Sequence, residues 1–328
     1  MRRRDLIAWL GGIAAWPMAT QAQQPAAPVV GFLTTRAPSD DAHLVAAFRQ
    51  GLGETGYFEG RNMAIEFRRA EGRYDRLPDL AADLVRREVS VISVAGGGTP
   101  AALAAKVATS KIPIVFNVGV DPVATGLVAS LSQPGGNITG VSNLSGTVTA
   151  KRLELFHELV PMTSEVALLV NPTNPRLTEF ETTEVRNAAR SLGLQVYVVG
   201  AGTAQEIDAA FPLLIERQAG AFLLSTDAYL ASRRDQIVAL AARHAIPAMY
   251  PLSEMVKVGG LVSYGYSNPE IYRLVGVYTG RILRGERPAD LPVQQSTKFE
   301  LVINLKTARG LGLDIPAKLL ALADEVIE

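Results

Sequence analysis

Residues 89–116, VSVISVAGGGTPAALAAKVATSKIPIVF, contain the unit that determines the fold. An apolar, β-rich run at 89–94 is followed by a glycine-rich turn, a helical stretch at 99–110 and a second apolar run at 112–116. Continuous apolar runs separated by helices of ten or more residues are typical of a buried parallel sheet that helices cover on both faces. The stretch therefore predicts a β-α-β unit of an α/β fold.

The same alternation extends along the whole chain and occurs twice. The first copy has predicted strands at 29–33, 63–67, 89–94 and 112–116, with helices at 41–56, 74–88 and 99–110. The second copy has strands at 166–170, 195–199, 221–224 and 246–250, with helices at 178–192, 204–217 and 228–244. Matched strand positions are 123 to 137 residues apart, from Thr139 with Val262 to Val30 with Ala167. Two copies of one unit explain this spacing better than two unrelated α/β halves do.

We expect two Rossmann-like lobes joined by a hinge that the chain crosses several times. The predicted boundaries are 29–143 plus 266–293 for the first lobe and 144–265 plus 294–328 for the second. The crossings are placed near 140–145, 264–268 and 291–297, and the run 299–305 fits either lobe. Open α/β sheets bind ligands at the carboxyl ends of their strands, so facing lobes would enclose a ligand between two sets of strand-end loops.

The composition excludes several classes of protein. The chain has 328 residues, 32 basic and 32 acidic, and 48% of them are hydrophobic. These values argue against a disordered chain and against a nucleic-acid binder, which normally has a clustered basic excess. Cysteine is absent, which excludes disulfides, thiolate metal sites, a cysteine nucleophile and a lipid anchor on cysteine. With three widely spaced histidines and no catalytic motif, we expect no metal, no cofactor and no enzymatic activity.

The first 22 residues have the order of a secretory signal peptide. Arg2, Arg3 and Arg4 precede an apolar run that ends at Trp16, and small residues follow. The arginine pair also resembles a twin-arginine export signal. A buried N-terminal helix is the alternative. No later run approaches 18 apolar residues, so we expect an exported, soluble, periplasmic monomer without a direct membrane anchor.

The candidate ligand-binding residues of the first lobe follow its predicted strands. They are Thr34, Thr35, Gly97, Gly98, Thr99, Phe116 and Asn117. The glycines allow the backbone to approach a ligand, and Thr99 before Pro100 predicts an N-cap. A helix N-terminus favours an anion such as a carboxylate. The alternative is a tight turn with only a structural role.

The candidate residues of the second lobe occupy the equivalent positions. They are Asn171, Asp227, Tyr250 and Tyr264. Asp227 is suited to neutralise a ligand ammonium, and the tyrosines to surround an apolar or aromatic group. Alternatively, Asp227 caps the helix that follows it and the tyrosines line a seam between the lobes.

Several segments resemble bacterial ABC-transporter substrate-binding proteins of the tryptophan/tyrosine type. The similar segments are 95–106, 112–116, 121–122, 133–141, 151–155, 245–251, 259–265 and 297–308. The resemblance implies the type 1 periplasmic binding-protein fold, and a small carboxylate-bearing solute, an amino acid of the aromatic class, delivered to an ABC permease and its ATPase. A ligand sensor that presents its closed form to a membrane receptor is the alternative.

The resemblance also implies roles for individual residues. The turn Gly97-Gly98-Thr99 would hold the ligand carboxylate and Asp227 its amino group. Phe116, Tyr250 and Tyr264 would surround its side chain. If Asp227 points away from the cleft, a ligand without an ammonium is favoured.

Overall fold

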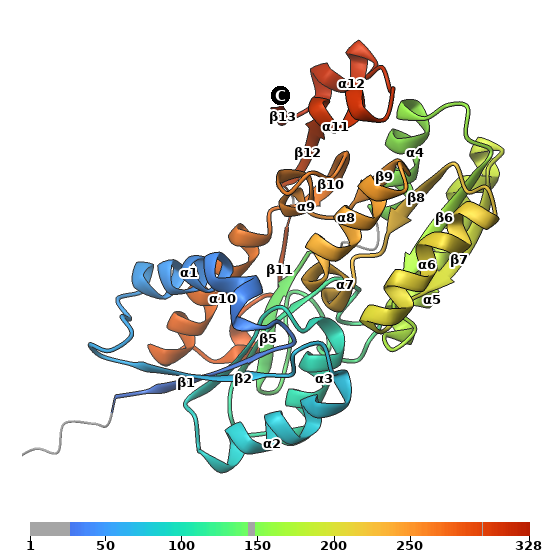
Figure 1. Ribbon diagram of the computed structural model, residues 1–328. Coiled ribbons are helices and arrows are strands. Elements are labelled where there is room, and N and C mark those ends of the chain that lie inside the picture. Colours follow the sequence, from blue (N-terminus) through green and yellow to red (C-terminus); the bar gives the residue numbers. More distant parts are fainter. Residues whose placement is uncertain (1–26, 144–147, 297) are drawn as a thin grey trace, which may run out of the picture.

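The structure, a computed structural model, describes residues 27–143, 148–296 and 298–328 and contains two separate α/β sheets (Figure 1). The predicted signal peptide at 1–22 lies outside the described residues. We call the first sheet with its helices lobe 1 and the second sheet with its helices lobe 2. The predicted fold class, two α/β units with mainly parallel sheets, is confirmed.

Lobe 1 contains a six-stranded sheet in the order β11-β5-β4-β3-β1-β2, and every neighbouring pair is parallel. Its strands are β1 (Val29–Thr34), β2 (Ala64–Arg69), β3 (Val91–Val94), β4 (Ile114–Val118), β5 (Ile138–Ser142) and β11 (Gln294–Gln295). Its helices are α1 (Pro38–Glu54), η1 (Tyr74–Arg76), α2 (Leu77–Arg86), α3 (Gly98–Ala108), α10 (Asn268–Leu283) and η2 (Pro288–Asp290).

The helices of lobe 1 cover both faces of its sheet. On one face α1 packs against α10, although the two helices are far apart in the sequence (Figure 1). Gly276 permits this packing, because a Cβ atom there would lie 2.1 Å from the carbonyl oxygen of Phe48. On the other face α2 and α3 bury the apolar side of β3 and β4. Burial on both faces explains why these strands are continuously apolar.

Lobe 2 contains a seven-stranded sheet in the order β13-β12-β10-β9-β8-β6-β7. Its strands are β6 (Glu165–Val170), β7 (Gln195–Gly200), β8 (Ala221–Leu224), β9 (Ala248–Tyr250), β10 (Val262–Tyr266), β12 (Phe299–Asn304) and β13 (Glu325–Ile327). Its helices are α4 (Thr149–Leu159), α5 (Pro175–Leu192), α6 (Ala204–Glu216), α7 (Ala228–Ser232), α8 (Arg234–Arg243), α9 (Ser253–Lys257), α11 (Leu305–Gly310) and α12 (Ala317–Leu322).

Three details differ from the sequence prediction. β12 pairs antiparallel with β10, which places the run 299–305 in the lobe 2 sheet. We assigned residues 294–295 to the second lobe, and this prediction is wrong. They form β11 and pair with β5 in lobe 1. The predicted helix 228–244 is two helices, since Arg233 leaves helical geometry with φ −96° and ψ 20°.

The polypeptide passes between the lobes near the predicted crossings. β5 is followed by α4 of the other lobe, β10 by α10, and β11 by β12. No helix in the described part of the chain is both long and apolar enough to span a membrane.

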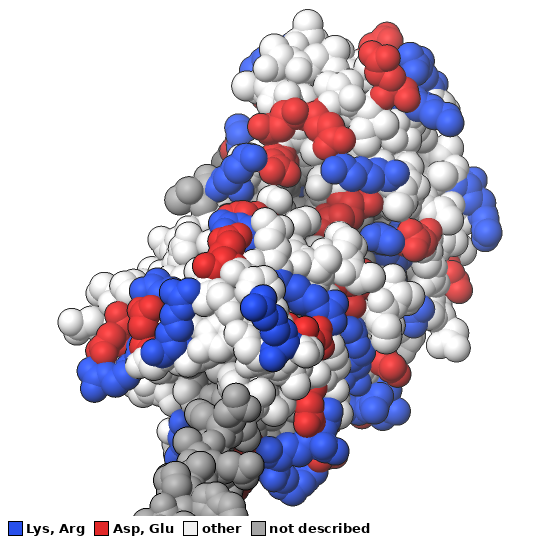
Figure 2. Space-filling model, turned by 90° about the vertical axis from the view of Figure 1, so that its left-hand side faces the viewer, with Lys and Arg blue, Asp and Glu red and all other residues white. Residues whose placement is uncertain are grey.

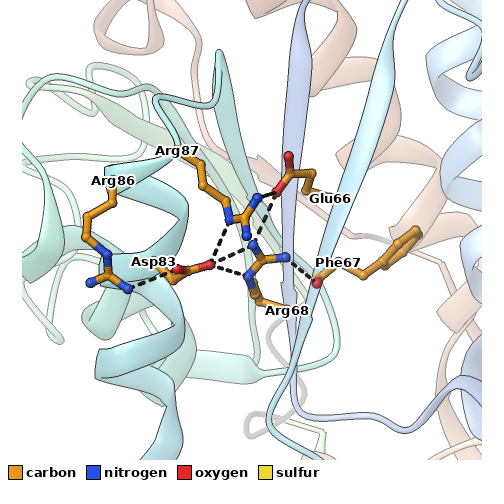
Figure 3. A network of polar contacts seen from close by, with 6 residues as sticks. All are labelled: Glu66, Phe67, Arg68, Asp83, Arg86 and Arg87. Atoms are coloured by element: carbon orange, nitrogen blue, oxygen red, sulfur yellow. Dashed lines mark hydrogen bonds and ion pairs between the residues drawn. The ribbon is translucent and has the colours of Figure 1, made fainter.

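Charged side chains of both signs are interspersed on the face of the molecule that Figure 2 shows. One cluster stabilises the edge strand β2 of lobe 1 (Figure 3). In this cluster the Asp83 carboxylate of α2 accepts hydrogen bonds from Arg68 of β2 at 2.6 Å and from Arg86 and Arg87 at 2.9 and 3.1 Å. The cluster therefore fastens α2 to the sheet edge.

Candidate ligand-binding site

A cavity lies between the two lobes, at the carboxyl ends of strands from both sheets. Its volume is about 50 Å³, so the two lobes enclose little free space between them in this structure. Lobe 1 contributes Arg36, Tyr74, Gly96, Gly98, Thr99, Asn117, Gly119, Val120, Asn143 and Asn268 to its lining. Lobe 2 contributes Asn174, Leu177, Thr226, Ala228, Ala231, Leu252 and Tyr266, the last of these at the end of β10. The lining is mainly neutral and polar, with a few aliphatic and aromatic side chains.

Arg36 is the charged side chain of this lining. It follows β1, and only 6% of its surface is exposed. Its Nε is buried without a hydrogen-bond partner, and its guanidinium forms no ion pair within 4.0 Å in the described part of the chain. Burial lowers the pKa of Arg36, but nearby Tyr272 and Glu254 attract the cation, and the net direction is upward. The side chain is therefore a buried cation.

The turn before α3 lies next to Arg36. Gly96 has φ +77°, and a Cβ atom there would lie 3.1 Å from Cδ of Arg36 and 2.2 Å from the hydroxyl of Tyr272. Glycine is therefore required by both the backbone conformation and the close packing. The predicted capping by Thr99 is wrong, because α3 begins at Gly98 and no side chain caps it. Thr99 lies in the first turn of α3, where it lines the cavity.

Asp227 lies behind the cavity wall of lobe 2, and its carboxylate is fully hydrogen-bonded. Oδ1 accepts from the side chain of Asn171 at 2.9 Å and from two backbone N–H groups of α7. Oδ2 accepts from Asn174 and from the hydroxyl of Tyr74, each at 2.9 Å. Burial raises the pKa of Asp227, and the donors Asn174, Asn171 and Tyr74 oppose that shift. Asp227 caps α7, which was the alternative prediction, and it does not line the cavity.

Tyr74 connects the two lobes through Asp227. Its ring belongs to η1 of lobe 1, whereas Asp227 belongs to lobe 2. The phenol is buried in the contact between the lobes, and this burial is the main reason why its pKa is raised. The hydrogen bond of 2.9 Å is therefore a direct bridge between the lobes.

A second buried network supports Thr226. The carboxylate of Glu181 accepts from the hydroxyl groups of Ser225 and Thr226 and from the backbone N–H of Thr226. Arg152 of α4 forms an ion pair with Glu181 at 3.4 Å, and both side chains are fully buried. The network links α4, α5 and the end of β8, and it fixes one wall of the cavity.

Comparison with known proteins identifies the family. Residues 36–327 match the family model described as ABC transporter substrate binding protein. This chain belongs to that family. The membership predicted from the sequence is confirmed, and substrate-binding proteins of ABC systems act outside the cytoplasm.

Individual relatives agree with this assignment. The tyrosine-binding protein of Clostridioides difficile (strain R20291) is 27% identical over 266 residues, which span 81% of this substrate-binding protein and 75% of the relative. A conserved domain protein from Vibrio cholerae has a TM-score of 0.83 at 26% identity, with 92% of this chain and 99% of that chain covered. The structure of an ABC domain in complex with L-Trp from Streptococcus pneumoniae has a TM-score of 0.82 at 26% identity and the same coverage.

The residues predicted from the sequence fall into two groups in this substrate-binding protein. Gly98, Thr99 and Asn117 line the cavity. Asn171, like Asp227, lies behind the cavity wall. Thr35 does not line the cavity either, and its hydroxyl donates to the carbonyl of Gly96 at 2.6 Å. The others, Thr34, Gly97, Phe116, Tyr250 and Tyr264, are not among the lining residues.

The aromatic residues predicted to surround the ligand point into the cores of the lobes. Phe116 is buried with α2 and α3, and Tyr250 is buried with the helices on one face of lobe 2. Tyr264 packs against Phe299, with ring centroids 6.1 Å apart. None of the three lines the cavity, because each side chain packs against a hydrophobic core.

Sequence reasoning missed several residues of the cavity, and Arg36 is the most important. It directly follows the pair Thr34-Thr35, so a charged residue at the end of the first predicted strand was visible in the sequence, whereas its burial was not. Tyr74 was also missed as a lining residue, whereas Tyr266, which the sequence offered with Tyr250 and Tyr264 as a possible wall for a ligand, does line the cavity. Within the described ranges, no three His, Asp or Glu side chains are grouped so that they could hold a metal ion.

Proposed function

We propose that this protein captures an aromatic amino acid in the cavity between its lobes and delivers it to a membrane permease driven by an ATPase. The observation that carries the proposal is an enclosed cavity whose lining comes from the strand ends of both sheets. The relatives named for tyrosine binding and for an L-Trp complex support an aromatic amino acid as the ligand class.

Closure of the lobes is the proposed mechanism of capture. The two lobes, with the boundaries given above and β11 added to lobe 1, would rotate about the three crossings. A ligand favours the closed state only through contacts that it makes with both lobes at once. Thr99 and Asn117 on one side and Asn174 and Thr226 on the other are placed for such contacts.

The cellular part of the proposal concerns export and partners. Residues 1–22 would direct the chain to the periplasm, by the general or the twin-arginine route, and would then be removed. The mature protein would act as a monomer that binds its solute without chemical change.

A thermal-shift series tests the proposed function. We expect L-tryptophan, L-tyrosine or L-phenylalanine to raise the melting temperature, since a ligand at 100 times its Kd adds about 2.7 kcal/mol to the stability. L-lysine and glucose serve as negative ligands. The recovered ligand should be chemically unchanged by mass spectrometry, and a modified product would instead indicate an enzyme.

Two matched variants locate the ligand. Leu177→Trp places a large ring in the cavity, because Leu177 lines it and is 8% exposed. Leu322→Trp makes the same change at a position that is 55% exposed. We expect the first variant to lose the ligand-induced shift and the second to keep it. An equal shift in both variants would place the ligand elsewhere, and no shift in the wild type with any aromatic amino acid would refute the proposed ligand class.

A further inference from the structure

The charge of the cavity lining is unbalanced. Arg36 contributes a cation, and no aspartate or glutamate is among the described residues that line the cavity. The remaining lining side chains are neutral. The anions that balance Arg36 must therefore come from outside the lining, either from the buried acids behind it or from a ligand.

The two acids that attract Arg36 have other neighbours. Asp41 forms an ion pair with Arg69 at 2.8 Å. Glu254 of α9 lies 3.8 Å from the imidazole of His43. Neither forms an ion pair with Arg36 within the 4.0 Å that defines the described pairs. The guanidinium is thus attracted by these acids but is left without a bonded anion.

The N-terminus of α3 adds a second positive feature to the same cavity. This helix has 11 residues, its first turn includes Gly98 and Thr99, and both line the cavity. The first N–H groups of a helix have no partner within the helix and carry partial positive charge. Arg36 packs over Gly96, two residues before the helix begins. Two positive features close together favour an anion between them.

The ammonium group of an amino acid has no charged partner among the described residues that line the cavity. Asp227 is the nearest candidate in lobe 2, but its two oxygens already accept five hydrogen bonds. Asn117, Asn174 and Thr226 line the cavity and offer neutral oxygen atoms. An ammonium group would therefore be held by neutral acceptors.

We infer that Arg36, together with the N-terminus of α3, is the receptor for the ligand carboxylate, and that this protein selects its ligand by the carboxylate and not by the ammonium. This inference rests on the proposed function, because it assigns the two ends of a ligand in the same cavity. It makes Arg36 a specificity-determining residue of the site.

Ligand analogues test the inference on the wild-type protein. Calorimetry with L-tryptophan, tryptamine and indole-3-propionate compares the intact ligand with analogues that lack the carboxylate or the amino group. Loss of one partner of a buried charge pair predicts that tryptamine binds about 100-fold more weakly or worse. Loss of hydrogen bonds to neutral acceptors predicts only about a 10-fold weaker binding of indole-3-propionate. The reverse order would overturn the inference.

Variants of Arg36 test whether this residue binds the ligand carboxylate. Arg36→Met keeps the approximate length and removes the charge, so L-tryptophan should bind about 100-fold more weakly. Arg36→Lys should recover part of the affinity. The ligand-free Arg36→Met protein should still fold and should lose less stability than Arg152→Met, because the attraction of Glu254 is lost but no direct ion pair is broken. Unchanged affinity of Arg36→Met, or a large loss of its stability, would overturn the inference.

Glu254→Gln is the matched control. If Arg36 is only the structural partner of Glu254, this variant should weaken binding as much as Arg36→Met does, and that result would overturn the inference. We expect a change of less than about 5-fold, because no direct bond joins the two groups.

The failure of the inference is distinguishable from that of the proposed function. A panel of acetate, benzoate and succinate extends the thermal-shift series beyond amino acids. If one of these carboxylates binds and requires Arg36 while no aromatic amino acid does, the proposed ligand class fails and the inference stands. If no carboxylate stabilises the wild type, the inference fails.

Discussion

Two arginines of this protein are buried, and their surroundings are opposite. Arg152 is fully buried and donates to the carbonyl of Leu224 at 3.1 Å and to the hydroxyl of Thr149 at 2.6 Å, in addition to its ion pair with Glu181. Arg36 is almost as buried, but its guanidinium has no such partner in the described ranges and faces the cavity. A buried arginine whose partners belong to the chain stabilises the fold. A buried arginine without such partners can bind an anion that enters the cavity.

The same contrast separates a strand end of lobe 2 from a strand end of lobe 1. Asp227 follows β8 and was expected to meet a ligand, yet its oxygens are occupied by donors from both lobes. The turn after β3 in lobe 1 has the N–H groups of a helix start that no side chain caps. At the strand ends near the cavity, lobe 2 therefore has a carboxylate whose hydrogen bonds are satisfied. Lobe 1 has a positively charged arginine and helix N–H groups that no side chain caps.

The largest effect on stability should come from replacing Arg152, the arginine that is paired with Glu181. Arg152→Met leaves Glu181 buried without its cation, and we expect a loss of about 3–5 kcal/mol in the free energy of unfolding. The same change at Arg36 should cost clearly less stability, because no direct ion pair is broken there. Urea unfolding of the two ligand-free variants measures the difference.

A double variant identifies the cause of that loss. Adding Glu181→Gln to Arg152→Met removes the unpaired charge and should restore part of the stability, as a double-mutant cycle can show. Equal stability of the two single arginine variants would remove the distinction between the paired and the unpaired site.

The alternation of strands and helices was predictable, because it depends on local patterns of apolar residues. The runs at 89–94 and 112–116 are the buried strands β3 and β4, within one or two residues at each end. The antiparallel pairing of β12 was not predictable, since its neighbour β10 is more than 30 residues earlier in the chain. Such pairing depends on the path of the chain and not on the composition of the strand.

The site was predicted only in part, for a similar reason. Neighbouring side chains of a strand point to opposite faces, so that Asn117 reaches the cavity while Phe116 enters the core. The sequence shows that both residues lie at a strand end. It does not show toward which face of the sheet each side chain points. Arg36 was missed because its burial is produced by Tyr272 and by α9, which are distant in sequence.

An intermediate effect should come from the bridge between the lobes. Tyr74→Phe removes one of the five donors to Asp227 and leaves the four donors of lobe 2 in place. A hydrogen bond to a charged group contributes about 1.5–3 kcal/mol, so the closed state should weaken and the Kd for L-tryptophan should rise roughly 10-fold. Calorimetry measures this change, and small-angle scattering should show a more open ligand-free protein.

Tyr197→Phe is the control for the bridge. Tyr197 lies on β7 within lobe 2, where Arg217 stacks on its ring. It has no contact across the cleft among the described interactions, so the Kd should stay the same. An unchanged Kd in Tyr74→Phe as well would mean that the bridge does not contribute to capture.

The smallest effect should come from a carboxylate that is paired and only partly buried. Asp83 is surrounded by Arg68, Arg86 and Arg87 (Figure 3), and the bond from Arg68 is the main reason why its pKa is lowered from 3.8 to about 2. A lowered pKa in the folded state means that the ionised cluster stabilises the protein above about pH 4 and that this contribution is lost as the pH falls through 2. Asp83→Asn should therefore lower the melting temperature at pH 7 by on the order of 1 °C, because solvent screens exposed ion pairs.

The pH dependence separates this cluster from the buried pair. The difference between Asp83→Asn and the wild type should shrink between pH 4 and pH 2, as measured by calorimetry at several pH values. Asp290→Asn, which removes a carboxylate paired with Arg287 alone, should show a smaller difference with the same sign. A difference that grows on acidification would contradict the assignment, because protonated Asp83 has no charge left to lose. In contrast to Arg152 and Glu181, partly exposed charges of this kind are hydrated when their partner is removed, so the loss of the partner costs little stability.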